Sequence, residues 1–190
     1  MFGKDAIVIS LKLFIITAVA ALCLAFVNKV TEPVIEKNAQ LSKVKALNNV
    51  LDAEEFSDPE TVGKDIDGIT IDEVYVGKNG DDIAGYVVNA VSHEGYGGDV
   101  KVMVGFNESF EVTRIEILES SETAGLGANA SKPSFAGQFE GTKGVLEVVK
   151  DNAKEGQIEA ISSATVTSKA VTNAVNASRK IVEEKFGGAE

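Results

Sequence analysis

The 190-residue sequence has little of the chemistry that most catalytic and metal sites use. It contains one cysteine, Cys23, one histidine, His93, and no tryptophan. A single cysteine excludes an internal disulfide bond and a cysteine-based zinc site. A lone histidine without a Gly-x-Ser-x-Gly motif gives no support to a serine-hydrolase triad. A phosphate-binding loop and a dinucleotide fingerprint are also missing, so the sequence does not indicate nucleotide binding of those kinds.

Basic residues are scarce as well. The chain has 18 lysines and arginines against 29 aspartates and glutamates, a net charge of −11. A nucleic-acid partner needs a basic face that neutralises phosphates, so we expect no nucleic acid to bind. The acidity itself is typical of a well-solvated surface.

Charge is almost absent from the N-terminal stretch AIVISLKLFIITAVAALCLAFV, residues 6–27, in which Lys12 is the one charged residue. A helix needs about 20 apolar residues to cross a bilayer, so residues 1–30 are predicted to form a transmembrane anchor in contact with lipid. A cleaved signal peptide fits less well, because the run is long and no Ala-x-Ala site follows it. Lysines flank both ends of the run in similar number, which gives only a slight preference for a cytoplasmic N-terminus.

The next segments are predicted from residues typical of helix starts and from the spacing of apolar residues. Thr31 before Pro33 suggests a helix start, and leucines and valines then recur at helical spacing, so 32–52 is expected to be a stalk helix within a linker, residues 31–58. Residues 59–190 are expected to form the main domain. Within it, 69–119 is predicted to be an antiparallel meander of about four strands, with a hairpin turn at Asn79-Gly80.

The C-terminal part of the domain is predicted to contain both helices and strands. In residues 120–131 the apolar residues do not recur at a regular spacing, so this stretch is expected to be a loop. Residues 134–139 are expected to form one helical turn, and GVLEVV and IEAI are expected to form two short strands. From Ser163 onward apolar residues recur at helical spacing as far as Gly187-Gly188. Strands followed by helices predict an α+β fold.

One stretch of that region, EAISSATVTSKAV at 159–171, concentrates hydroxyl groups at the predicted helix start. They belong to Ser162, Ser163, Thr165, Thr167 and Ser168. The unpaired amides and the positive dipole end of a helix N-terminus favour an anion such as phosphate. Simple capping by Ser162 or Ser163 is the alternative.

The same stretch resembles the attachment motif of the covalent FMN-binding domain family. In that family a flavin transferase recognises a pattern like Asp-x-x-Ser/Thr-Gly-Ala-Thr and joins FMN through its phosphate to the last threonine. Thr165 matches that threonine, Ser162 the first hydroxyl and Ala164 the alanine, whereas Glu159 and Ser163 stand where aspartate and glycine are usual.

Two further stretches resemble the family in the same order. Gly95-Tyr96-Gly97-Gly98 followed by VKVMVGF resembles the opening of the domain. ETAGLG at 122–127, followed by Phe135 and Gln138-Phe139, resembles its flavin-contacting loop, usually ETPGLG. The resemblance covers about 95–186. With the N-terminal anchor included, the chain resembles the G-subunit family of Rnf electron-transport complexes, to which the C-type subunits of sodium-translocating NADH:quinone oxidoreductases are related.

The resemblance implies a flavoprotein subunit that relays electrons between ferredoxin and NAD in a membrane complex that moves sodium or protons. It implies FMN bound covalently at Thr165, with other Rnf subunits and a flavin transferase as partners, and a domain outside the cytoplasm. The implied cofactor contacts are Ser162, Ser163, Ala164, Glu122, Thr123, Gly125, Leu126 and Gly127. A non-redox scaffold subunit remains the alternative, as does a C-type subunit of the quinone oxidoreductase.

Overall fold

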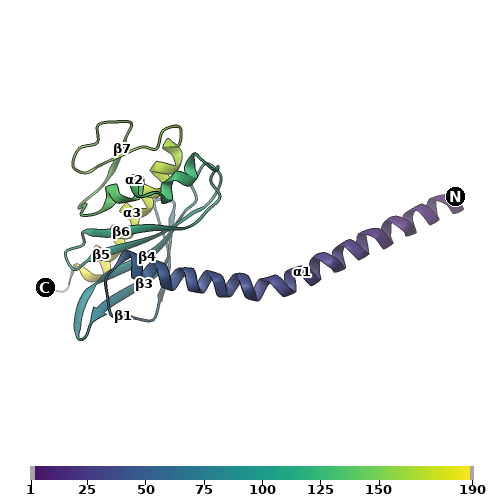
Figure 1. Cartoon of the computed structure of the whole chain (residues 1–190), viewed down its shortest axis with the longest axis horizontal. Helices are drawn as coiled ribbons and strands as arrows, with labels where there is room; N and C mark the ends of the chain where they lie inside the picture. The colour runs from purple at the N-terminus through teal and green to yellow at the C-terminus, as the bar shows by residue number, and fades with distance from the viewer. Residues whose placement is uncertain (1–2, 189–190) are drawn as a thin grey trace. The chain divides into compact units, whose positions relative to one another are not determined.

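The computed structural model describes residues 3–188 and divides the chain into two compact units, Met1–Ser42 and Lys43–Glu190. Figure 1 shows one long helix in the N-terminal part and a sheet with helices in the remainder.

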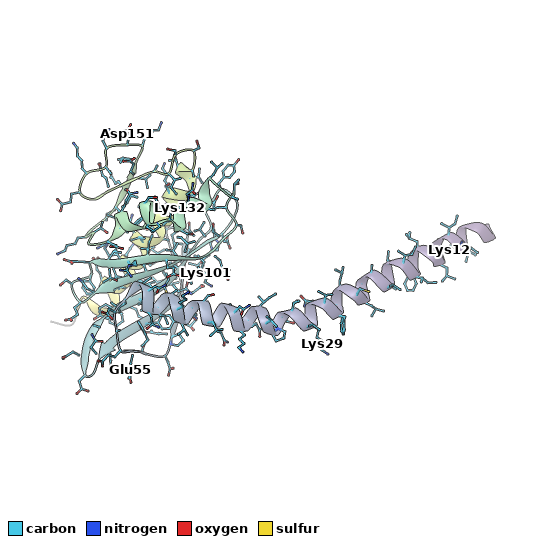
Figure 2. All side chains as sticks on the ribbon, viewed as in Figure 1. Lys12, Lys29, Glu55, Lys101, Lys132 and Asp151 are labelled. Carbon is cyan, nitrogen blue, oxygen red and sulfur yellow. The ribbon has the colours of Figure 1, made fainter. Side chains whose placement is uncertain are left out.

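The N-terminal unit consists of helix α1, which runs from Lys4 to Val50 and so continues into the second unit. Its apolar part is long enough to cross a membrane, and Lys12 and Lys29 lie toward the two ends of that part (Figure 2). The predicted helix start at Thr31 is wrong. The Thr31 hydroxyl donates back to the carbonyls of Val27 and Asn28, at 3.0 and 3.2 Å, as it does inside a helix. The helix continues through Pro33, at the cost of one main-chain hydrogen bond.

The second unit is built on a six-stranded sheet in which every pairing is antiparallel, and this confirms the predicted meander. Its strand order is β1-β3-β4-β5-β6, and β2 also pairs with β3. The strands are β1 (Glu55–Phe56), β2 (Glu60–Ile66), β3 (Ile69–Asn79), β4 (Asp82–Ser92), β5 (Val100–Asn107) and β6 (Val112–Ser120). Strands β1 and β2 were not predicted from the sequence.

The predicted hairpin turn lies between β3 and β4. Asn79 pairs with Asp82, which leaves Gly80 and Asp81 as the turn, and Gly80 has a φ of 61°. Positive φ is the reason that Asn-Gly sequences favour such tight turns.

The elements after β6 cover one face of the sheet (Figure 1). They are the 3₁₀ helix η1 (Gly127–Ser131), α2 (Pro133–Ala136), η2 (Gly137–Phe139), the parallel pair β7 (Glu147–Val149) and β8 (Gln157–Glu159), and α3 (Thr165–Phe186). The predicted turn at 134–139, both short strands and the C-terminal helix are therefore confirmed as elements. The result is the α+β fold that the sequence predicts.

Successive side chains of a strand point to opposite faces of the sheet. Each face of this sheet carries its own cluster of buried apolar side chains. On β5, Val102, Val104 and Phe106 pack in the larger core beneath α3, whereas Met103 packs in a smaller cluster with Val50 from the end of α1. This close approach requires a glycine at position 105, because a Cβ there would lie 2.2 Å from the Val50 carbonyl oxygen.

A polar cluster borders the smaller core. The Glu73 carboxylate accepts hydrogen bonds from Lys43 Nζ at 2.8 Å, the Tyr75 hydroxyl at 2.9 Å and Asn89 Nδ2 at 3.3 Å. Burial acts to raise the pKa of Glu73, but the hydrogen bonds from Lys43, Tyr75 and Asn89 together outweigh it and hold the pKa below its ordinary value.

We predict that Glu73→Gln destabilises the second unit at neutral pH and much less in acid. The depressed pKa contributes stability above the unfolded value of about 4.3, and that contribution is lost as pH falls through the folded pKa. The expected loss at neutral pH is roughly 1–2 kcal/mol, because the carboxylate remains partly exposed. Thermal unfolding of the full chain in detergent at neutral pH and near pH 3 measures it.

The matched control is Glu155→Gln, which alters an exposed carboxylate of the same domain. A Glu73→Gln variant whose loss of stability is as large in acid as at neutral pH would contradict the assignment.

Candidate functional site

Three segments far apart in the sequence meet at a cavity of about 420 Å³. The segments are the loop after β4, the loop after β6 and the start of α3. Their lining residues are Tyr96, Glu122, Thr123, Leu126, Gly127, Ser163, Ala164, Thr165, Val166 and Thr167. Such a volume is in the range of small-molecule sites, roughly 300–1,000 Å³.

Most residues that the family resemblance singled out line this cavity. They are Glu122, Thr123, Leu126, Gly127, Ser163, Ala164 and Thr165. Gly125 and Ser162 do not line it. Gly125 lies in the same loop with a φ of 79°, and its carbonyl accepts a hydrogen bond from Asn129 Nδ2 at 2.9 Å. Ser162 lines a neighbouring cavity of about 570 Å³, which also includes Lys132 and Gln138.

The predicted capping of α3 by Ser162 or Ser163 is wrong. The helix begins at Thr165, its N-cap position is Ala164, and no side chain caps it. Ser163 lies outside the helix in a left-handed conformation, with a φ of 62°. Ser168 stabilises this turn instead, because its hydroxyl accepts from the Ile161 N–H at 3.0 Å and donates to the Ala164 carbonyl at 3.0 Å.

The uncapped start of α3 leaves donors free at the cavity. Within residues 3–188, the N–H groups of Thr165, Val166 and Thr167 donate to no main-chain or side-chain acceptor. Thr167 is only 1% exposed and also lines the cavity. A helix N-terminus with unpaired amides attracts anions, and a hydroxyl group that borders the same cavity can donate to them. These residues therefore fit a phosphate group.

Glu122 joins the two loops of the cavity wall. One carboxylate oxygen, Oε1, accepts from the main-chain N–H of Tyr96 at 2.8 Å. The other carboxylate oxygen, Oε2, lies against Gly127. A Cβ at position 127 would lie 2.6 Å from this oxygen and 2.8 Å from the Thr167 hydroxyl. The carboxylate is thus used in positioning main chain, and Gly127 is needed because no larger residue fits between Glu122 and Thr167.

The loop after β6 closes on itself over residues 123–128. The Thr123 carbonyl accepts from the N–H groups of Leu126, at 3.1 Å, and Ala128, at 3.3 Å. This turn leaves the Leu126 side chain 43% exposed beside the cavity. An apolar side chain held in this way offers a surface for a flat apolar ring.

Gln138 fixes the strand that leads into α3. Its Oε1 accepts from the Glu159 N–H at 2.7 Å, and its Nε2 donates to the Glu159 carbonyl at 3.2 Å. The amide thus pairs with main chain as another strand would. This explains a second stretch of the resemblance in physical terms, because Gln138 positions the segment that carries the hydroxyl groups.

Three cavity residues were not predicted from the sequence: Tyr96, Val166 and Thr167. The sequence around Tyr96 could have indicated a site residue, because a large aromatic residue among glycines in a loop is unusual unless it makes a contact. Val166 and Thr167 had no such indication beyond their closeness to Thr165, because their orientation depends on where α3 begins.

Comparisons with known proteins agree with this geometry. The model of the FMN-binding domain family matches residues 95–180, and that of the RnfG N-terminal region matches residues 1–50. The chain is 38% identical to the G subunit of the Na(+)-translocating ferredoxin:NAD(+) oxidoreductase complex of Acetobacterium woodii, over 92% of this chain and 90% of that one. It is 36% identical to the G subunit of the proton-translocating ferredoxin:NAD(+) oxidoreductase complex of Clostridium ljungdahlii, over 90% and 88%.

Two solved structures share the fold. NqrC of Shewanella oneidensis aligns with a TM-score of 0.52 and 22% identity, over 67% of this chain and 65% of that one. The corresponding C-type subunit of the Na(+)-translocating NADH-quinone reductase of Parabacteroides distasonis gives a TM-score of 0.53 and 21% identity, over 75% and 81%. The resemblance noted from the sequence motifs is confirmed, and the chain belongs to the family of G subunits of ion-translocating ferredoxin:NAD(+) oxidoreductase complexes.

Proposed function

We propose that this chain is the membrane-anchored flavoprotein subunit of such a complex and relays electrons within it. The assignment is supported by the two G-subunit relatives, whose complexes are named for ferredoxin, NAD(+) and a translocated ion, and by the match to the FMN-binding domain. The relatives differ in the ion, Na(+) in one and the proton in the other, so the proposal includes either. The fold shared with the C-type subunits is what a related flavin carrier would have.

Thr165 is the proposed attachment residue, and a single observation carries the choice. Its side chain is exposed on the cavity wall at the first residue of an uncapped helix. The other hydroxyl groups of the stretch are less suitable: Thr167 is buried, Ser168 is already hydrogen-bonded, and Ser162 lines the neighbouring cavity. Ser163 also borders the cavity but lies before the helix.

The remaining cavity residues would hold the cofactor by different interactions. The free amides at the start of α3 and the Thr167 hydroxyl would donate to the phosphate. Leu126 and Val166 would pack on the isoalloxazine ring, and Glu122 would keep the two loops in place. Bound FMN supplies the electron-transfer chemistry, and the protein supplies position and environment. An ester to Thr165 would keep the cofactor in place without deep burial.

The anchor would place this flavin at a membrane. We propose that the apolar part of α1 spans the bilayer with the N-terminus in the cytoplasm, so that the second unit lies on the extracytoplasmic side. The other members of the complex are the proposed partners in the membrane, and a flavin transferase is the proposed maturation partner. The acidic surface would suit a basic partner face.

Thr165→Val is predicted to abolish covalent flavin attachment. Valine has nearly the shape of threonine but no hydroxyl to form the ester, so the fold should persist. The chain is expressed with an active flavin transferase and run on a denaturing gel, where fluorescence under ultraviolet light reports attached flavin. The wild-type band should fluoresce and the Thr165→Val band should not.

Two matched variants serve as controls, Thr167→Val and Ser163→Ala, which remove the neighbouring hydroxyl groups at the same cavity. Both bands should keep their fluorescence, although Thr167→Val should hold the flavin less rigidly. A dark Thr167→Val band with a fluorescent Thr165→Val band would show that the wrong hydroxyl was chosen. A wild type that purifies colourless despite an active transferase would favour the scaffold alternative.

A further prediction concerns the orientation of the chain in the membrane. In a Cys23→Ser background, a cysteine introduced at the exposed position Glu155 should react with a membrane-impermeant maleimide in intact cells or spheroplasts. A cysteine introduced at Lys4 should react only after lysis, because the proposed topology places it in the cytoplasm. The reverse labelling pattern would contradict the topology while leaving the flavin assignment intact.

A further inference from the structure

The loop between β4 and β5 is shaped to present one side chain. Its glycines lie against neighbouring main chain: a Cβ at Gly95 would lie 2.1 Å from the Gly98 carbonyl oxygen, and one at Gly97 would lie 2.2 Å from that of Ser121. Gly98 adopts a φ of 131°, which other residues rarely reach. Tyr96 is the one large side chain among these glycines, and it is 78% exposed.

This loop is held from both sides. At its centre the Tyr96 N–H donates to Glu122 Oε1 at 2.8 Å, which ties it to the loop after β6. At its base the His93 ring lies 2.9 Å from the Asp99 carboxylate through Nδ1 and 3.1 Å from the Thr70 hydroxyl through Nε2. The position of Tyr96 is therefore fixed by the main chain around it and does not depend on packing of its own ring.

The Tyr96 ring belongs to an apolar rim around the cavity. Within the described part of the second unit, the exposed large apolar side chains are Val44, Ile83, Tyr96, Leu126, Val145 and Val166. Tyr96, Leu126 and Val166, from three separate segments, line the same cavity as Thr165. Exposed apolar groups that gather around a cavity mark a binding site, and an aromatic ring among them suits a flat aromatic ligand.

We infer that Tyr96 packs on the isoalloxazine ring of the flavin attached at Thr165 and shields it from water and dissolved solutes. The inference rests on the proposed function and adds a cofactor contact outside both the hydroxyl stretch and the ETAGLG loop. Tyrosine suits this position because it presents a large planar surface, and its hydroxyl can remain in water while the ring is covered.

This contact explains why the glycine-rich loop is held in one conformation. A flexible loop would have to be ordered each time the ring was covered, at a cost in conformational entropy. The hydrogen bond from Tyr96 to Glu122 and the close glycine contacts order the loop in advance. Tyr96 thus acts as a preformed cover beside Leu126 and Val166.

The test measures how easily iodide, a small soluble quencher, reaches the flavin of the full chain loaded by a flavin transferase. Tyr96→Ser and Tyr96→Leu both remove the planar ring, and Tyr96→Phe retains it. The iodide quenching constant should rise roughly twofold in Tyr96→Ser and Tyr96→Leu, because a stacked tyrosine covers one of the two ring faces. It should stay near the wild-type value in Tyr96→Phe, since the ring alone provides the cover.

The matched control is Val145→Ser, which removes an apolar side chain that is 80% exposed and lies outside this cavity. It should leave the quenching constant unchanged. Quenching constants of the two ringless variants equal to that of the wild type would overturn the role of Tyr96 and leave the flavin site standing. An equal rise of the quenching constant in Val145→Ser would also overturn this role, because it would indicate that substitution loosens the whole domain. A wild type without flavin would overturn the proposed function itself and the cover with it.

Discussion

Glu122 accepts a hydrogen bond at 2.8 Å from the main-chain N–H of Tyr96, and the geometry of the candidate site depends on this contact. The same carboxylate lies against Gly127, in a space that no side chain larger than glycine could share. One charged group thereby holds together two loops, the one before β5 and the one after β6. Because a hydrogen bond to a carboxylate is stronger than one between neutral groups, it can order a loop that has few packed side chains of its own.

The rest of the site depends on where α3 lies. This helix buries an apolar side against the sheet, with residues such as Val171, Val175 and Val182 fully covered. That packing fixes the helix along its length and sets its N-terminus beside the loops joined by Glu122. The start of the helix is left uncapped at this point, and Ser168 stabilises the preceding turn from within the helix. The donors that a cap would have used therefore remain available to a ligand.

Much of this fold was predictable because the sequence carries local signals for it. The β3–β4 hairpin follows from alternating apolar residues around Asn79-Gly80, and α3 follows from its helical period. Strand β2 was missed because Glu60–Ile66 is mostly exposed and polar, and its ladder with β3 stabilises it instead of an apolar face. A separate stalk helix was predicted wrongly because Thr31 and Pro33 are typical of a helix start but also fit inside a long helix.

The site was predictable to a similar extent, and for similar reasons. The ETAGLG loop and the threonine motif are contiguous in sequence, so their residues could be recognised, and the structure brings most of them to one cavity. Capping was predicted wrongly because hydroxyl groups at a helix start usually cap, and the left-handed turn at Ser163 cannot be read from a serine. Tyr96 and Thr167 were missed because their place at the cavity depends on long-range packing between loops and helix.

We propose that one oxygen atom, the Thr165 hydroxyl, carries FMN. The most direct measurement is the intact mass of the purified full chain, followed by mapping of the peptide that bears any adduct. The account predicts a mass increase equal to one FMN less one water, located on Thr165. A purified chain of unmodified mass after expression with an active transferase, or an adduct on another residue, would contradict it.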